Sequence, residues 1–471
     1  MMAGGELHYM SAWELSGLIR NREVSPVEVV EACLARIEET EPTLNSFITL
    51  MPEQARSAAR RAEDEIGRGS YRGPLHGIPV GLKDLFNTAG VKTTSGTRIY
   101  DNFVPDEDCT VATKFGQAGA ILLGKLNMHP LAFGPTGENG DYGHMHNPWN
   151  PERVTGGSSG GSGSAAAAGQ CTITMGTDTG GSVRIPAALC GIVGLKPTYG
   201  RVSRAGLTPL SWCLDHPGPM VRTVEDAALT MNVIAGHDTR DHATSEVPVP
   251  DYTSALTGDI RGLRIGVVKE YFETEIDPAV AALTQQAITV LGELGAEIVE
   301  VSLPVYEYAQ PISNAILSAE ATAAHRDILL SDGDKLYPQV RERLEEGLFI
   351  SATEYLRAQQ ARQVFCQQVA GLLENVDLLA GPVEPVTAPR ILERRIEIGG
   401  EALPAVPMLT KYTRVYNITG SPAISVPCGF GPDGLPVGLH LAGRNFDEST
   451  VLRAAYAYQQ ATDWHTRRPP L

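Results

Sequence analysis

Several features that mark common protein classes are missing from this chain. No apolar run reaches the ~18 residues of a membrane-spanning helix, and residues 1–6 do not begin a charged and then apolar leader. The chain has no C-x-x-C pair, no H-E-x-x-H motif and no P-loop or dinucleotide-binding glycine fingerprint. These absences predict a cytoplasmic protein without a membrane segment, a metal or a nucleotide cofactor.

Positive charge is also scarce. The 471 residues include 38 Lys and Arg against 55 Asp and Glu, which gives a formal net charge of −17. Such a balance argues against a surface that binds nucleic acid or an anionic membrane, because both need clustered cations. It does not exclude a partner subunit that binds nucleic acid.

The seven cysteines are few and scattered. Their odd number and their positions inside apolar runs predict reduced, buried thiols rather than a disulfide framework. A cysteine nucleophile would need a positioned base, and the sequence singles none out. With 42% apolar and 20% charged residues, the composition is that of an ordinary globular protein.

What the chain does contain is an alternation of strand-like and helix-like segments. Ser25-Pro-Val-Glu28 is a capping box that predicts a helix over about 25–40, and Asp277-Pro278 predicts another that ends near Gly295. Short apolar runs predict strands at 77–83, 120–125, 171–175, 191–195, 263–268, 297–303, 376–380, 423–427 and 437–441.

This alternation predicts an α/β fold, with a large mixed sheet covered by helices on both faces. A chain of this length usually contains two or three domains. Large α/β enzymes can have longer single domains, and we expect one domain over 1–471. Residues ~305–375 lack strand-like runs and predict a helical insertion that helps to wall the active site.

Three separated segments carry the residues of a candidate active site. Gly156–Ser162 and Thr177–Ser182 are two glycine turns that bear serines, and Lys83 ends an apolar run 75 residues before Ser158. Serine needs a base to become a nucleophile, and a desolvated lysine is neutral enough to serve. Glycine turns present several N–H groups to one oxygen, as acyl transfer requires. Together the segments predict a hydrolase that uses neither histidine nor metal.

Each of these features has a simpler interpretation. By composition the run Gly156–Gly169 is a flexible linker, although strand-like runs follow it and Ser164–Ala168 favours a helix. Taken alone, Ser182 would be a helix cap, and Lys83 would be a solvated charge at a strand end.

The chain resembles the amidase signature family, and the resemblance decides among these interpretations. The matching motifs are Gly77-Ile-Pro-Val-Gly-Leu-Lys83-Asp84, the Gly156–Ser162 turn and Gly176-Thr-Asp-Thr-Gly-Gly-Ser182-Val-Arg-Ile-Pro186. The match continues through Cys190–Thr198 and resumes in Asn417–Cys428 and Gly434–Gly438. These motifs are long and span most of the chain.

The resemblance implies the amidase signature fold and a Ser–cisSer–Lys relay. Ser182 is implied as the nucleophile, Ser158 as the bridge after a cis peptide bond, and Lys83 as the general base. The implied oxyanion hole consists of N–H groups of the residues Thr179, Gly180, Gly181 and Ser182.

Other residues receive less specific roles. We expect Ser159 to support the relay by hydrogen bonding, and Asp178 and Arg184 to hold the shape of the nucleophile turn. His144 and His146 have the wrong context for a metal site, so we expect a loop near the substrate mouth. Candidates for the substrate pocket are Met128, Phe133, Ile185, Ile316 and Leu317, each of which could equally be core.

Two function classes remain open at this stage. The first is a stand-alone amidase that cleaves small amides, anilides or carbamates, and the second is the glutaminase subunit of a tRNA-dependent amidotransferase, which delivers ammonia inside a complex. A non-catalytic scaffold is disfavoured because all three relay residues are present.

Two departures from the amidotransferase pattern favour the stand-alone amidase. The run Asn127–Gly134 lacks Asp-Glu-Phe, and the run Ala402–Gly420 contains no acid that would hold the amino group of glutamine. A buried ammonium without a carboxylate is costly. We therefore expect a small-molecule amide or carbamate as substrate and no nucleic acid or membrane partner, with a homodimer left open.

Overall fold

The computed structural model describes residues 7–273 and 275–471, so residues 1–6, on which the expectation about a leader rests, lie outside the described residues. Within these ranges eleven strands form one mixed sheet in the order β1-β3-β2-β6-β8-β7-β14-β15-β11-β9-β10. The strands are β1 Phe47–Leu50, β2 Pro79–Lys83, β3 Ile121–Leu126, β6 Ile173–Asp178, β7 Val193–Lys196, β8 His216–Val221, β9 Arg264–Val268, β10 Glu297–Val301, β11 Leu378–Pro382, β14 Ala423–Phe430 and β15 Pro436–Gly443.

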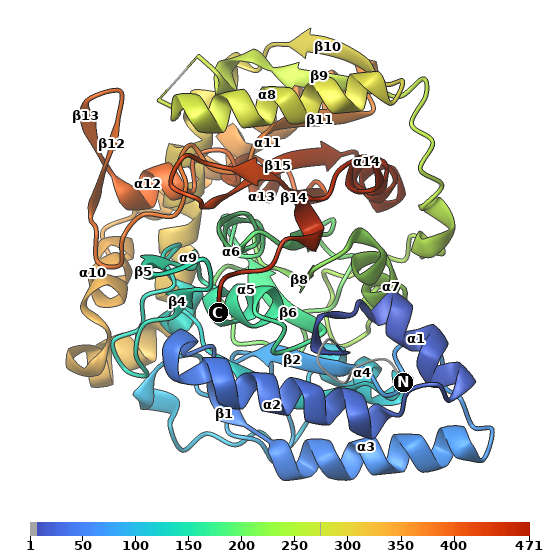
Figure 1. Ribbon diagram of the computed structural model, residues 1–471. Helices are drawn as coiled ribbons and strands as arrows, with labels where there is room; N and C mark the ends of the chain where they lie inside the picture. Colours follow the sequence, from blue (N-terminus) through green and yellow to red (C-terminus); the bar gives the residue numbers. More distant parts are fainter. Residues whose placement is uncertain (1–6, 274) are drawn as a thin grey trace.

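Two small hairpins lie outside this sheet, formed by β4 His146–Asn147 with β5 Asn150–Val154 and by β12 Arg395–Ile398 with β13 Glu401–Pro404. Helices cover both faces of the large sheet, as the sequence predicts (Figure 1). They are α1 Ala12–Asn21, α2 Pro26–Leu44, α3 Pro52–Gly67, α4 Thr110–Ala118, α5 Gly160–Ala167, α6 Arg184–Cys190, α7 Val224–Ile234, α8 Pro278–Glu293, α9 Ala309–Asp332, α10 Pro338–Gly347, α11 Ala352–Asn375, α12 Ala405–Leu409, α13 Arg414–Ile418 and α14 Glu448–Ala461.

Local sequence sets the starts of the helices. Ser25 and Glu28 form the predicted capping box of α2, with Pro26 at the first helical position. The Asp277 side chain accepts from backbone N–H groups at the start of α8. Each cap satisfies N–H groups that have no partner inside the helix.

The large sheet contains two groups of parallel strands, which a block of antiparallel pairs joins. Strand β2 is parallel to β3 and to β6, and β9 is parallel to β10 and to β11. Strands β8, β7, β14 and β15 join these two parallel groups through antiparallel pairs. In Figure 1, α2 and α3 lie at one end of the molecule and α8 lies at the other, with α5 and α6 between them.

Strand β8 was not expected from the sequence. Its segment His216-Pro-Gly-Pro-Met-Val221 contains two prolines, which normally argue against a central strand. Along β8, β6 pairs with all six residues, whereas β7 pairs only with Met220 and Val221. The prolines are tolerated because the pairing with β7 stops at Met220, so neither proline has to donate a hydrogen bond to β7.

The chain between β10 and β11 is helical. It contains α9, α10 and α11 in the segment where the sequence lacks strand-like runs. The three helices pack as a unit through α9, which contacts both α10 and α11. Helix α9 also contacts α13, which places the unit beside the segment that follows α12.

The sheet order brings the candidate residues to one edge. Strands β2 and β6 are parallel neighbours, with Leu82 paired to Met175. Their carboxyl ends therefore lie side by side. Lys83 is the last residue of β2, and the turn that carries Ser182 follows β6.

Candidate active site

Lys83 is fully buried at the end of β2. Its Nζ donates hydrogen bonds to Ser158 Oγ at 2.7 Å and to Thr177 Oγ1 at 2.8 Å. Burial lowers the pKa of Lys83 to about 7, although the carboxylates of Asp215 and Asp178 oppose this shift. A lysine with such a pKa has a substantial neutral fraction at pH 7, and a base needs the neutral form.

Ser158 is held between Gly157 and the start of α5. The Gly157–Ser158 peptide is cis, which is the isomer that the resemblance implies. Ser158 O accepts from His129 N at 3.0 Å. A Cβ on Gly157 would lie 2.5 Å from the backbone N of Gly137, so no other residue fits this turn.

Ser159 lies behind the relay residues and is completely buried. Its Oγ donates to Thr177 O at 3.2 Å and accepts from Thr177 N at 3.3 Å. Thr177 is the second partner of Lys83. The structure therefore places Ser159 where it fixes the backbone of a residue that holds the lysine.

The turn that carries Ser182 connects β6 to α6. Within the described residues, the N–H groups of Thr179, Gly180 and Ser182 have no hydrogen-bond partner, whereas Gly181 N donates to Asp178 Oδ1 at 2.8 Å. Gly181 has φ +130°, and Ile185 and Thr413 leave no room for a Cβ. Three N–H groups of the turn are thus available to an incoming oxygen.

Asp178 and Arg184 form a buried pair beneath this turn. Arg184 Nε and Nη2 each reach the Asp178 carboxylate at 2.9 Å. Although burial alone would raise the pKa of Asp178, the Arg184 guanidinium holds it below its ordinary value. Asn417 Nδ2 donates to Asp178 Oδ1 at 2.8 Å. These contacts tie the turn to α6 and to α13.

A small cavity opens above Ser182. Of the residues predicted for the substrate pocket, Phe133 and Leu317 line it, while Met128, Ile185 and Ile316 are fully buried and are not among its lining residues. The lining consists of Ala132, Phe133, Gly134, Pro135, Thr179, Gly180, Ser182, Leu210, Leu317, Arg343, Thr410 and Arg414. Lys83 and Ser158 are joined by a hydrogen bond, and none is found between Ser158 and Ser182 in the part of the chain described.

Two arginines in this lining were missed in the sequence. Arg414 is 2% exposed, and burial together with the charge of Arg343 lowers its pKa to about 9. Burial lowers the pKa of Arg343 to about 10. Neither forms an ion pair with any residue that the structure describes. No motif marks either residue, since both lie far from the glycine turns in the sequence.

His144 and His146 are the two histidines that the sequence analysis weighed as metal ligands, and the structure shows their hydrogen-bond partners. His144 Nδ1 accepts from Asn139 N at 3.1 Å, and His146 Nδ1 contacts Pro151 O at 2.6 Å. In residues 7–273 and 275–471, no three His, Cys, Asp or Glu side chains group so as to hold a metal ion.

All seven cysteines are free thiols.

Helix α5 makes a close contact that can be tested. A Cβ on Gly161 would lie 2.5 Å from Asn127 O and closer still to Ser46 O, both backbone atoms. We expect Gly161→Ala to destabilise the fold by about 3 kcal/mol. A matched control is Gly17→Ala in α1, where nothing lies within 4 Å and a gain of ~0.5–1 kcal/mol is expected. Thermal unfolding of the two variants checks this, and equal midpoints would contradict it.

The fold, together with the buried lysine, the two serines and the glycine turn at the carboxyl ends of β2 and β6, is that of a hydrolase. The chain belongs to the Amidase family, whose profile matches residues 28–452. It is 48% identical to a glutamyl-tRNA(Gln) amidotransferase subunit from Chloroflexus aggregans, over 99% of each chain.

Solved structures agree with this assignment. A structure described as a vestigial protein complex that reveals the evolutionary origins of an s-triazine catabolic enzyme matches with TM-score 0.92 and 35% identity, over 96% of this chain and 98% of that one. The corresponding glutamyl-tRNA(Gln) amidotransferase subunit from Thermotoga maritima matches with TM-score 0.82 and 33% identity, over 97% and 95%.

These findings correct the function expected from the sequence. The preference for a stand-alone amidase is wrong, because the chain matches an amidotransferase subunit over 99% of its length. The expectation of an amide or carbamate substrate handled without any nucleic-acid partner is wrong for the same reason. A carboxylate that holds the amino group need not come from the acid-free run 402–420. In the structure Glu342 and Glu346 of α10 line a second cavity, which adjoins the Ser182 cavity at Arg343 and Arg414.

No helix in the described residues is both long and apolar enough to cross a membrane.

Proposed function

We propose that this chain is the glutamine-hydrolysing subunit of a glutamyl-tRNA(Gln) amidotransferase, which releases ammonia from glutamine for use within a complex. The observation that carries the proposal is the 48% identity to such a subunit over 99% of both chains. The sheet runs through the whole described chain, from β1 to β15, and we propose that residues 1–471 act as one domain, with ~305–375 as a helical insertion beside the site.

The proposed reaction begins with proton transfer through the buried residues. Neutral Lys83 takes a proton from Ser158, and Ser158 takes one from Ser182, whose Oγ attacks the amide carbonyl. The three unpartnered N–H groups, those of Thr179, Gly180 and Ser182, stabilise the oxyanion. Ser158 returns the proton to the leaving nitrogen, and ammonia departs. Water then hydrolyses the acyl-enzyme through the same relay.

The charges around the cavity fit an amino acid amide. Buried cations are normally paired, yet the buried Arg414 and the half-buried Arg343 line the cavity of Ser182 without an ion-pair partner among the described residues. We propose that they bind the α-carboxylate of glutamine. Glu342 and Glu346, in the adjoining cavity, are the candidate partners of its ammonium group.

Glutamine hydrolysis by the purified chain, alone and as the complex that copurifies with it, tests the function. Glutamate release that stops when Ser182 is replaced supports the proposal. Turnover of neutral anilides or carbamates without any turnover of glutamine, in both preparations, would contradict it.

The carboxylate-binding role predicts a substrate-dependent effect of Arg414→Gln. Loss of a charge-assisted hydrogen bond costs ~1.5–3 kcal/mol, so we expect KM for glutamine to rise roughly 10–100-fold. Butyramide lacks the carboxylate, and its kcat/KM should change little. Steady-state kinetics on both amides make the comparison, with Arg394→Gln, outside the Ser182 cavity, as the matched control. Equal losses on glutamine and butyramide would show a structural role instead.

A further inference from the structure

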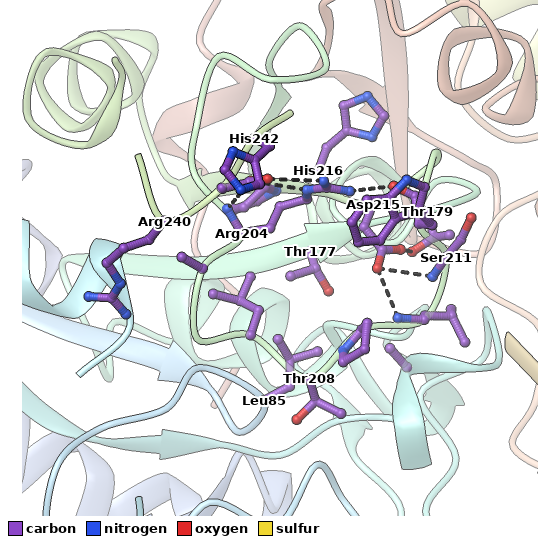
Figure 2. A pocket seen from close by; sticks show the side chains of 18 residues that line it. Leu85, Thr177, Thr179, Arg204, Thr208, Ser211, Asp215, His216, Arg240 and His242 are labelled. Atoms are coloured by element: carbon purple, nitrogen blue, oxygen red, sulfur yellow. Dashed lines mark hydrogen bonds and ion pairs between the residues drawn. The ribbon is translucent and has the colours of Figure 1, made fainter. Parts of the chain in front are cut away.

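A second cavity, which we call the Asp215 cavity, adjoins the nucleophile turn at Thr179. It has a volume of about 270 Å³, and its lining includes Thr177, Thr179 and Asp215. Figure 2 shows these side chains together with Arg204, Thr208 and Ser211 around the same space. The Asp215 cavity and the Ser182 cavity share Ala132, Thr179 and Leu210. Thr179 therefore lines both cavities at once.

Asp215 holds Thr179 from the side of the Asp215 cavity. Its Oδ1 accepts from Thr179 Oγ1 at 2.6 Å, and its Oδ2 accepts from Leu210 N at 2.8 Å and from Ser211 N at 3.0 Å. Three donors fix the carboxylate in one orientation. Since Leu210 also lines the Ser182 cavity, the Asp215 carboxylate holds two of the three residues that the cavities share.

The loop that carries Asp215 is itself anchored. The Ser211 hydroxyl and Cys213 N donate to the carboxylate of Glu320 in α9. Tyr355 of α11 donates to the same carboxylate at 2.7 Å. The helical segment 305–375 thus supports the loop, and the loop supports the turn.

We propose that Asp215 is a positioning residue for the reaction at Ser182. Through Thr179 it fixes the turn whose N–H groups face the substrate carbonyl, and its negative charge acts on Lys83. This inference rests on the proposed function, because it assumes that Ser182 and Lys83 carry out acyl transfer. Asp215 contacts none of the reacting atoms, so its effect passes through Thr179 and through the field at the lysine.

The charge effect has a defined sign. Burial lowers the pKa of Lys83, and among the neighbouring charges Asp215 is the first that raises it again, followed by Asp178. His129 also faces the lysine, and burial lowers its pKa to about 3, so it is neutral. Removing the Asp215 charge therefore moves the pKa of Lys83 further down. The other titratable or charged groups around Asp215 are Tyr199, Arg204, Arg240, Asp241, His242 and His216.

The test uses two variants that break the same hydrogen bond from opposite ends. Asp215→Asn and Thr179→Val should each lower kcat for glutamine on the order of 10–100-fold, with little change in KM, because a misplaced oxyanion donor is felt in the transition state. The double variant should lose no more than the worse single one. Thr179→Ser keeps the hydroxyl and should recover most of the loss.

The pH profile separates positioning from a merely structural role. The acid limb of kcat/KM should move to lower pH in Asp215→Asn and stay in place in Thr179→Val. A matched control is Asp241→Asn, which removes another carboxylate from the same lining, one that accepts from Arg204 at 3.2 Å. It should not move the limb. An Asp215→Asn variant with parental kcat, or with a lower kcat and an unmoved limb, would overturn the proposal.

Labelling of Ser182 by a fluorophosphonate distinguishes failure of this inference from failure of the proposed function. The labelling rate depends on the nucleophile and not on glutamine. A chain that is labelled but does not hydrolyse glutamine, either alone or as the copurified complex, would contradict the function. The variants would then be compared by labelling rate against pH. If Asp215→Asn does not fold, the comparison of Thr179→Val with Thr179→Ser tests the inference instead. Equal rates of glutamine hydrolysis by these two variants would overturn it.

Discussion

Replacing Ser182 with alanine is expected to reduce glutamine hydrolysis on the order of 10⁴-fold or more, because no acyl-enzyme can form without the hydroxyl. The serine is 7% exposed and lines the same cavity as Arg343 and Arg414. Glutamate release from glutamine measures the loss. Since Arg343 and Arg414 remain in the lining, the variant should still bind glutamine with an affinity near that of the parent.

Ser162→Ala is the matched control for this loss. Ser162 belongs to the other glycine turn and is fully buried, and its Oγ donates to Met175 O at 3.0 Å, away from the lysine. We expect it to keep most of the activity, and the fluorophosphonate should label it as it labels the parent. Residual turnover by Ser182→Ala comparable to that of Ser162→Ala would mean that another residue is the nucleophile.

The predictable part of this fold is the part encoded by local pattern. Caps such as Ser25 with Glu28, and apolar runs such as that ending at Lys83, depend on neighbours in sequence, so the mixed sheet and its helices follow from them. Strand β8 does not, because its prolines are tolerated only through the short overlap of β7 with it. A partner strand decides that outcome, and no local pattern shows it.

The residues of the site also fall into those that sequence motifs identify and those that only the packing of distant segments brings to it. Lys83 and Ser158 lie 75 residues apart but in recognisable motifs, and the structure joins them by a hydrogen bond of 2.7 Å. Arg343 and Arg414 come from α10 and α13, and their position beside the nucleophile depends on how α9 packs against both helices. Surface arginines and buried ones look alike in a sequence. The wrong prediction of function has the same origin, since the charged residues that line the two cavities lie outside the motif segments.

Replacing Lys83 with methionine is expected to lower kcat/KM for glutamine about 10³-fold or more, since the relay loses its base. In the parent the base must be neutral, and burial lowers its pKa to about 7. Activity of the parent should therefore rise with pH through about 7 and then level off. The residual activity of Lys83→Met should lack this acid limb. Rates measured from about pH 5.5 to 9, on both sides of the Lys83 pKa, check both statements.

The low pKa of Lys83 also predicts how stability depends on pH, and here the Lys83→Met variant gains where its activity is lost. The folded protein releases the Lys83 proton near pH 7, whereas the unfolded chain keeps it up to the ordinary value of 10.5. Between these values the unfolded state binds more protons, so the stability of the parent rises with pH. The free-energy cost of burying the Lys83 ammonium in the folded protein has its full value below pH 7 and decreases to zero as the pH approaches 10.5. Relative to the parent, Lys83→Met should thus be most stable at low pH and lose that advantage as pH rises.

Lys335→Met controls for the loss of a lysine as such, because the Lys335 side chain is 65% exposed and pairs with Asp332 far from the relay. Its activity and its stability relative to the parent should stay constant between about pH 7 and 9. A Lys83→Met variant with parental activity at about pH 8 would exclude lysine as the base. One that is inactive, yet shows no pH-dependent stability difference from the parent, would mean that Lys83 stays protonated in the folded protein and acts through its charge. The two measurements together therefore separate a base from a fixed cation, which activity alone cannot do.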